Sequence, residues 1–240
     1  MNKQKQYYSD WRMENMCAYC GGYATTEDHV PSKCFLDHPH PDNPPVVPCC
    51  EKCNREFSID EEYVSCFIDC VKERTVIPEE IRREKTRKSL IHTPKLARLI
   101  KSQIFDFGGV IQYEPDRSRF EKVMRKLAFG HLAYMNDTLT FDSDFEVTMS
   151  FLQEMHPSRL AVFERPYTGL LLPEVGSRAL TRWAVAITYE DGDSKQFSSF
   201  SNWDVVQKGR YRYCVSPDSN KIKLVIAECL AAEINVNHSH

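Results

Sequence analysis

The sequence predicts an α+β protein: a small metal-stapled module comes first, helices follow, and an antiparallel sheet ends the chain. Three features support this prediction. Two Cys-x-x-Cys pairs enclose a proline-rich loop, apolar residues recur at helical spacing in the middle of the chain, and alternating apolar residues with turn signals occupy the last third. We expect a lead-in (1–16), the module (17–62), a helical region (63–158) and a mostly antiparallel β region of unknown role (159–240).

The composition is ordinary for a soluble globular protein, with 42% hydrophobic and 27% charged residues in a chain of 240. The net charge of −3 argues against a uniformly basic surface, so any surface for nucleic acid must be local. No run approaches the roughly 18 apolar residues of a membrane helix, and the polar start of the sequence has no apolar signal core. We therefore expect no membrane association, reduced thiols and a cytoplasmic location.

Four cysteines have the spacing of a metal site. Cys17 and Cys20 form one Cys-x-x-Cys pair, and after 29 residues Cys50 and Cys53 form the second. Four cysteines in two such pairs suit the ligands of a tetrahedral structural Zn²⁺. This role is favoured over that of reduced cysteines packed in a hydrophobic core. Cys49 could replace Cys50 as a ligand, but the two-residue spacing to Cys53 favours Cys50. A module this small, with few large apolar residues, needs the metal to fold.

The segment between the two pairs carries an acid and a histidine that a purely structural zinc site does not need. The pattern predicts a short strand at 25–30 that ends at Pro31, and a structured loop at 36–48, where five prolines occur. In a regular strand Asp28 and His29 would point to opposite faces. Both can serve one site only where the strand becomes irregular, and Pro31 is consistent with such a place.

Helical periodicity begins after the second cysteine pair. Ser58 and Glu61 fit a capping box at the start of a helix, and Cys66 and Cys70 lie on its apolar stripe, where core packing is the expected role. Further helices are expected at 78–91, 95–104, 116–135 and 144–155. On the helix at 116–135, His131 sits on the apolar stripe and is expected to be buried and hydrogen-bonded.

The last third of the chain predicts an antiparallel sheet of four to six strands. Asp191-Gly192 is a hairpin turn signal after an alternating strand, and a second hairpin joins 211–215 to 222–227. The other strands are expected at 159–164, 169–172 and 182–189. No catalytic signature occurs there, so this region is expected to serve substrate recognition, a homo-oligomer or protein-partner interface, or the larger core.

Several elements within residues 17–63 occur in a distinctive order. They are Cys17-Ala-Tyr-Cys20, Asp28-His29-Val30-Pro31, Asn43, Cys50-Glu-Lys-Cys53 and Asn54, followed by Phe57-Ser-Ile-Asp-Glu-Glu-Tyr63. In this order they resemble a bacterial, four-cysteine subgroup of the HNH endonuclease family, whose ββα-metal motif joins a two-stranded hairpin to a helix around one divalent ion. The sequence departs from the family pattern in the Pro-Pro insertion after Asn43, in Asn54 where the family has its final histidine, and in Phe57 where a lysine is common.

Hydrolysis of a phosphodiester needs a base for water, a cation for the developing charge and help for the leaving oxygen. His29 suits the base because histidine takes up protons near neutral pH. Asp28 and Asn54 offer hard oxygen ligands for one Mg²⁺ or Mn²⁺, and the resemblance implies that Asn43 orients His29. Alternatives stay open: His29 as a zinc ligand or loop residue, Glu27 as the metal ligand in place of Asp28, Asn54 as a helix cap, and Asn43 as a turn residue.

We therefore expect a metal-dependent endonuclease that binds nucleic acid, with DNA favoured over RNA, and that carries structural Zn²⁺ and catalytic Mg²⁺ or Mn²⁺. Residues 71–104 include 10 basic and 4 acidic residues, and this net charge of +6 fits either solvated helix faces or a contact surface for phosphates. Two alternatives remain: a non-catalytic zinc module that binds nucleic acid or a protein partner, and a nuclease effector of a bacterial defence or mobile-element system.

Overall fold

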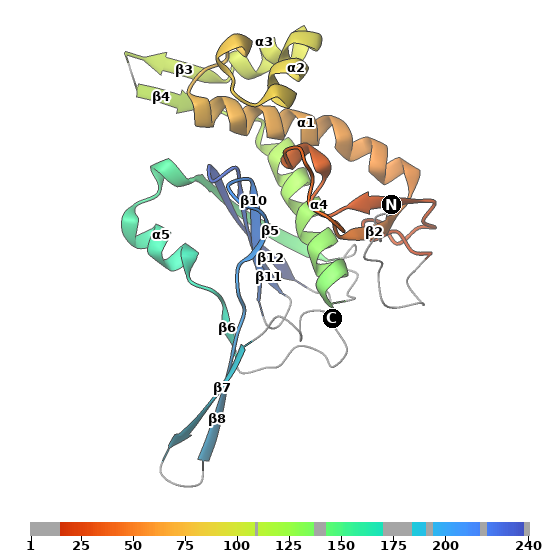
Figure 1. Ribbon diagram of the computed structural model, residues 1–240, viewed down its shortest axis with the longest axis vertical. Coiled ribbons are helices and arrows are strands. Elements are labelled where there is room, and N and C mark those ends of the chain that lie inside the picture. Colours follow the sequence, from red (N-terminus) through yellow and green to blue (C-terminus); the bar gives the residue numbers. More distant parts are fainter. Residues whose placement is uncertain are drawn as a thin grey trace.

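A computed structural model of the chain describes residues 15–108, 110–136, 143–169, 184–190, 194–216 and 220–237 (Figure 1). The α-helices in this part of the chain are α1 (Glu51–Glu73), α2 (Glu84–His92), α3 (Pro94–Lys101), α4 (Arg117–Asn136) and α5 (Pro157–Glu164). Short 3-10 turns occur at η2 (Lys33–Phe35), η3 (Pro78–Glu80) and η4 (Leu152–Glu154). Together the helices and the antiparallel strands form the α+β fold that the sequence predicts.

The described strands form four antiparallel sheets. Two sheets have two strands each: β1 (Thr26–His29) with β2 (Val46–Cys49), and β3 (Ile104–Phe107) with β4 (Val110–Tyr113). The largest sheet, β5-β12-β11-β10-β9, consists of β5 (Asp144–Phe151), β9 (Asp204–Gln207), β10 (Tyr211–Val215), β11 (Lys221–Ile226) and β12 (Leu230–Asn237). The fourth sheet, β6-β8-β7, consists of β6 (Thr168–Gly169), β7 (Ala184–Glu190) and β8 (Ser194–Phe200), and its β7–β8 hairpin extends away from the rest (Figure 1).

The N-terminal module is a hairpin followed directly by a helix. β1 and β2 pair in a regular antiparallel register, in which Asp28 is opposite Val47 and His29 is opposite Val46. The loop predicted at 36–48 ends at residue 45, because Val46–Cys49 form β2, and α1 follows β2 after a single residue. The order of elements is therefore that of a ββα motif.

α1 begins earlier than the sequence predicts. Its N-cap residue is Cys50, whose sulfur accepts the N–H of Cys53 at 3.4 Å, so the predicted cap at Ser58 is wrong. The Ser58 hydroxyl instead donates to the carbonyl of Arg55 at 2.8 Å within the helix. α1 then continues without a break to Glu73, so the boundary predicted between residues 62 and 63 falls inside it.

Two of the predicted helices are shorter than expected. The helix at 78–91 divides into η3 and α2, and the helix at 95–104 ends at Lys101, after which β3 begins. Gly108 has a φ of +68° between β3 and β4, a conformation that glycine adopts without steric cost, and the chain reverses there. The helix expected at 116–135 is confirmed as α4.

Two predictions near residue 150 are wrong. The helix expected at 144–155 is largely the strand β5, in which every second residue is apolar and the whole strand pairs with β12. The strand expected at 159–164 is the helix α5. Pro157 suits the first helical position, and Nδ1 of His156 accepts the N–H of Ser158 at 3.3 Å, so this short helix has both start signals.

The predicted C-terminal antiparallel sheet is confirmed, including the hairpin of β10 and β11. The strand expected at 182–189 is confirmed as β7. The turn at Asp191-Gly192 lies outside the described residues, and the strand expected at 169–172 is described only as far as Gly169. α4 contacts α1, β2, β5 and β12, so it joins the module to the sheet (Figure 1).

One buried core runs through the module, α1, α4 and the large sheet. His131 of α4 lies in this core: its Nε2 is 2.9 Å from the Tyr211 hydroxyl, and its ring stacks on Tyr213 with 3.8 Å between centroids. The predicted buried, hydrogen-bonded histidine is confirmed. Among the helices that the structure describes, none has an apolar stretch long enough to cross a bilayer.

Candidate metal centre and neighbouring polar clusters

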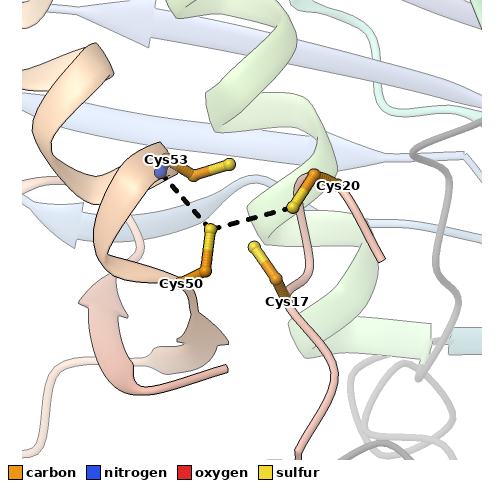
Figure 2. Close-up of side chains that lie close together, drawn as sticks. All are labelled: Cys17, Cys20, Cys50 and Cys53. Atoms are coloured by element: carbon orange, nitrogen blue, oxygen red, sulfur yellow. Dashed lines mark hydrogen bonds between the residues drawn. The ribbon is translucent and has the colours of Figure 1, made fainter. Parts of the chain in front are cut away.

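Four cysteines gather at the junction of the hairpin and α1 (Figure 2). Their sulfur atoms all lie within 4.8 Å of one another. Cys17 and Cys20 come from the turn before β1, and Cys50 and Cys53 come from the start of α1. Four thiol groups at this separation suit a tetrahedral ion such as zinc. The predicted metal group is therefore confirmed as a cluster that can hold an ion.

A tight turn places the first two sulfur atoms. The Cys17 N–H donates to the Gly22 carbonyl at 2.7 Å, and the Gly21 N–H donates to the Cys17 carbonyl at 2.9 Å. Gly21 has a φ of +70°, which most other residues adopt only with strain. A Cβ atom at Gly22 would make an ordinary van der Waals contact of 3.4 Å with Sγ of Cys20.

The thiols differ in how readily they lose a proton. A hydrogen bond with the Cys49 side chain is the main cause that lowers the pKa of Cys17, to about 4. Desolvation raises the pKa of Cys20 and the pKa of Cys53 above the usual thiol value. An ion that binds all four sulfur atoms as thiolates must displace protons from Cys20 and Cys53, so its affinity depends on pH.

Asp28 lies in a buried cluster of polar and ionisable side chains. Its Oδ2 accepts a hydrogen bond from the Tyr19 hydroxyl at 2.7 Å and lies 2.6 Å from Nζ of Lys126. The same ammonium is 2.5 Å from Oε1 of Glu61 and 2.5 Å from Oγ of Ser32. Burial disfavours the charge of Lys126, whose side chain is 2% exposed, but the two carboxylates outweigh burial and raise its pKa. An ion pair with Lys126 of α4 therefore holds the Asp28 carboxylate in place.

One interface between β1 and α1 carries two of the predicted site residues. Nδ2 of Asn54 donates to Oγ1 of Thr26 at 3.3 Å across this interface. Thr26 and Asp28 share a face of β1, because side chains alternate along a strand, and Asn54 shares a face of α1 with Glu61 two turns later. The structure thus brings Asp28 and Asn54 to one interface. His29, the next residue of β1, belongs to the opposite face of the strand and is half-buried.

Two further expectations concern the regularity of β1 at Asp28 and His29 and the role of Asn43 in the loop between β1 and β2. β1 stays regular through His29, and the chain bends only at Val30, so the irregular strand expected at Asp28 and His29 is absent from the described hairpin. Asn43 lies in the loop between β1 and β2, is exposed, and has a φ of +50°. Asparagine tolerates this left-handed conformation better than most residues. This is the geometry of a turn residue, the alternative role considered for Asn43.

Sequence reasoning missed the partners of Asp28. The sequence predicts Glu61 as part of a helix cap, whereas it lies in the middle of α1 and is buried. Lys126 is a charged residue between the apolar positions Met124 and Leu127 of α4, and this was the available signal that its side chain is buried. The pairing itself has no local signature, because α4 follows the module by more than 50 residues.

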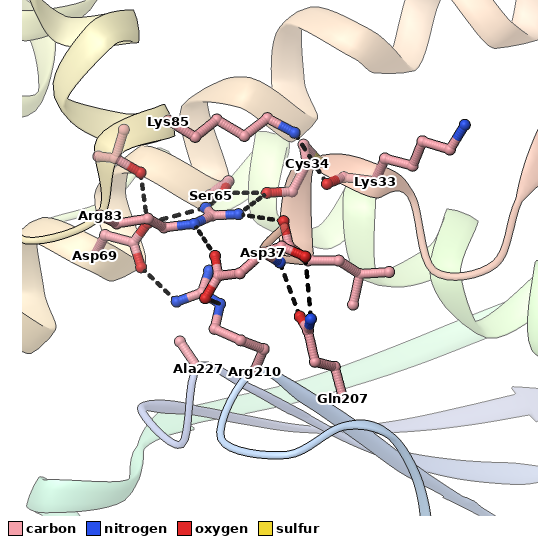
Figure 3. Close-up of polar contacts among 12 residues, drawn as sticks. Lys33, Cys34, Asp37, Ser65, Asp69, Arg83, Lys85, Gln207, Arg210 and Ala227 are labelled. Carbon is pink, nitrogen blue, oxygen red and sulfur yellow. Dashed lines mark hydrogen bonds and ion pairs between the residues drawn. The ribbon is translucent and has the colours of Figure 1, made fainter. Parts of the chain in front are cut away.

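A second charged cluster ties the module to the C-terminal sheet (Figure 3). Asp69 of α1 has a side chain that is 3% exposed, and it accepts hydrogen bonds from Arg83 at 3.0 Å, Arg210 at 2.9 Å and Thr86 at 2.5 Å. Arg83 also donates to Oδ1 of Asp37 at 2.6 Å. Because these residues come from the loop after β1, α1, the start of α2 and the β9–β10 turn, the cluster fixes four segments against one another.

The chain has no match among models of known protein families, among curated proteins or among solved structures. Roles for its residues are therefore assigned from geometry and chemistry. The geometry supplies a four-cysteine metal cluster, a ββα arrangement and two charged clusters, each at a defined place in the fold.

Proposed function

We propose that this chain is a zinc-stapled endonuclease that hydrolyses phosphodiester bonds in nucleic acid, DNA first, with the help of Mg²⁺ or Mn²⁺. The observation that carries the proposal is the β1-β2-α1 arrangement, closed by four cysteines, with Asp28 and Asn54 at one interface. We place the activity in the cytoplasm, where zinc-binding thiols stay reduced.

Zinc would be held by the four cysteines, and its contribution is structural. Bound there, it links the turn before β1 to the first turn of α1. Asn54 directly follows Cys53, so this link keeps the Asn54 amide beside Thr26 on β1. The zinc site therefore supports the interface without taking part in bond cleavage.

The residues at this interface fit a hard divalent ion. Oδ2 of Asp28 is bound by Tyr19 and Lys126, but within the described residues no hydrogen bond reaches Oδ1 of Asp28 or Oδ1 of Asn54. Carboxylate and amide oxygens are the ligands that Mg²⁺ prefers, and two protein ligands suffice because the ion retains water and substrate oxygens. Bound there, the ion would supply positive charge for the phosphate oxygens.

His29 is the proposed general base, and because it lies on the face of β1 opposite Asp28, it can act on the same phosphate only around the end of the strand. It is the last residue of β1, and the chain bends immediately after it. A half-buried imidazole at a strand end can take a proton from water while the hairpin holds its backbone in place. Lys126 is proposed as a positioning residue, because it holds Oδ2 of Asp28 and so orients the carboxylate.

A cleavage assay with the full-length, zinc-loaded protein tests this proposal. Plasmid DNA, linear DNA and RNA are incubated with Mg²⁺, with Mn²⁺ and without divalent ion. We expect metal-dependent cleavage that His29→Ala reduces at least a hundredfold, while the exposed control His92→Ala retains it. Absence of cleavage by the wild type in both metals, or full activity of His29→Ala, would refute the proposal.

The second candidate is a non-catalytic zinc module that binds nucleic acid or a protein partner. One observation favours it: Asp28 is buried and already paired with Lys126, and His29 lies on the other face of β1. For such a module His29→Ala would leave binding unchanged, whereas Cys50→Ser would destroy it. The same two variants therefore separate the candidates.

A further inference from the structure

A cavity of about 620 Å³ lies beside the charged cluster of Figure 3. Its walls come from the loop after β1, the last turns of α1, the segment around the start of α2, and Arg210 next to β10. Six of its lining residues are cationic and four are carboxylates: Lys72, Arg82, Arg83, Lys85, Lys88 and Arg210, against Asp37, Asp69, Glu73 and Glu84. The lining therefore carries two more positive than negative charges.

The two arginines at the base of the cavity are rigidly held. The side chains of Arg83 and Arg210 are each 10% exposed, and both pair with Asp69. Nε of Arg210 is buried and has no hydrogen-bond partner within the described part of the chain, although it lies 3.5 Å from Oδ2 of Asp37. The carboxylates of Asp69 and Asp37 therefore hold both guanidinium groups as the fixed base of the cavity.

Two lysines at the rim lack a described carboxylate partner. Nζ of Lys72 donates to the carbonyl of Ala227 at 2.8 Å, and Nζ of Lys85 donates to the carbonyl of Lys33 at 2.9 Å. By contrast, Arg82 pairs with Glu73 and Lys88 pairs with Glu84, at 3.4 Å and 2.7 Å. The positive charge that the carboxylates leave unmatched is therefore located on Lys72 and Lys85.

The cavity is close to the proposed catalytic residues. Lys33, which accepts the hydrogen bond from Lys85, follows His29 by four residues, a reach of at most about 14 Å. The basic character continues onto α3, which contacts α2: Lys95, Arg98 and Lys101 are exposed there, and the helix has no acidic residue. A polyanion bound near His29 can thus extend over Lys33 and Lys85 into the cavity.

We propose that this cavity binds a phosphate group of the nucleic-acid backbone and forms part of the substrate-binding surface of the proposed nuclease. The inference rests on the proposed function. The exposed ammonium groups of Lys72 and Lys85, which have no described carboxylate partner, match the charge and the several acceptor oxygens of a phosphodiester. Such a contact is independent of base sequence, so it contributes affinity and register rather than specificity.

Binding of a fluorescein-labelled DNA duplex of about two helical turns, and of the corresponding single strand, tests the inference. The full-length, zinc-loaded protein is titrated by fluorescence anisotropy without added magnesium, over a series of salt concentrations. The variant Lys72→Gln/Lys85→Gln should bind the duplex on the order of tenfold more weakly, and the slope of log K against log salt should fall by about two. Arg117→Gln/Lys221→Gln removes the same charge from exposed positions outside the cavity and should bind like the wild type.

Unchanged affinity and salt slope in Lys72→Gln/Lys85→Gln, or an equal loss in Arg117→Gln/Lys221→Gln, would overturn the inference. Both variants change exposed side chains, and equal thermal melting curves establish that each is folded. Single-turnover cleavage separates this inference from the proposed function. The cavity variant should need more protein for half-maximal rate yet reach the wild-type rate at saturation. If the cavity variant alone loses binding but the wild-type protein cleaves nothing, the phosphate site is supported and the proposed nuclease activity is refuted.

Discussion

The ammonium of Lys126 lies 2.6 Å from the Asp28 carboxylate, so a residue of α4 neutralises the acid at the centre of the ββα module. Glu61 of α1 contacts the same ammonium at 2.5 Å. Two carboxylates therefore face one cation, and the cluster carries one net negative charge when all three groups are ionised. That residual charge favours a further cation at the β1–α1 interface.

Loss of the Lys126 charge should destabilise the protein strongly. Lys126→Met keeps the length of the side chain but leaves Asp28 and Glu61 buried without a cation, and we expect a decrease of about 3–5 kcal/mol in the free energy of unfolding. Chemical denaturation measures the change. Lys122→Met is the control, because Lys122 is 43% exposed and pairs with Asp60, and its loss should be about 1 kcal/mol or less. Equal decreases in the two variants would contradict this account of Lys126.

Metal content should depend on Cys50 and be independent of Cys49. Cys50→Ser removes one of the four sulfur atoms of the cluster and should abolish stable zinc binding and unfold the module. Cys49→Ser changes the neighbouring buried cysteine, which lies outside the cluster, and should retain about one zinc per chain. Atomic absorption measures the zinc content of both purified variants. Loss of zinc in Cys49→Ser but not in Cys50→Ser would mean that Cys49, and not Cys50, is the ligand.

Zinc affinity should rise with pH. Because the pKa values of Cys20 and Cys53 are raised, both thiols are protonated near neutral pH and zinc must displace their protons. Cys17, with a pKa of about 4, is already a thiolate there and contributes no proton. Competition with a chelator should therefore give an affinity that falls at least tenfold per pH unit between about pH 8 and pH 6. An affinity independent of pH would contradict the protonation states.

The charged cluster around Asp69 should contribute more to stability than ion pairs at the surface. Asp69→Asn leaves the guanidinium groups of Arg83 and Arg210 without their buried counter-ion and should lower the free energy of unfolding by about 3 kcal/mol or more. Glu228→Gln is the comparison, because Glu228 is 41% exposed and pairs with Arg212. Its expected loss is about 1 kcal/mol or less. Similar losses would mean that Asp69 does not hold its four segments together.

The elements that the sequence predicts well have long or strictly periodic patterns. α4 has an apolar stripe over five turns, and the β10–β11 hairpin has alternation on both sides of its turn. The sequence predicts a helix where β5 forms and a strand where α5 forms. Each of these elements has only eight residues, and over that length an apolar pattern fits the helical and the strand period equally well. Residues 144–151 form a strand because they pair with β12, which lies some 80 residues later in the chain.

The candidate site was predictable to the same extent. Cys17, Cys20, Cys50 and Cys53 carry a spacing that only a shared ion explains well, and the structure brings them together. The role of Asp28 depends on Lys126, which is 98 positions away in the sequence and joins it only after α4 packs on the module. Contacts of this kind depend on the whole fold, so short-range patterns do not encode them.

α1 is one uninterrupted helix with the metal cluster at one end and a wall of the charged cavity at the other. Cys50 caps its first turn, and Lys72 lies in its last turn, a separation of about 33 Å along the helix axis. Over that length, a change of about 10° in the direction of the helix at Cys50 would shift Lys72 sideways by about 6 Å. An ion held by the four cysteines would therefore set the direction of this rigid helix, and the alignment of the cavity wall with His29 would depend on a site at the opposite end of α1.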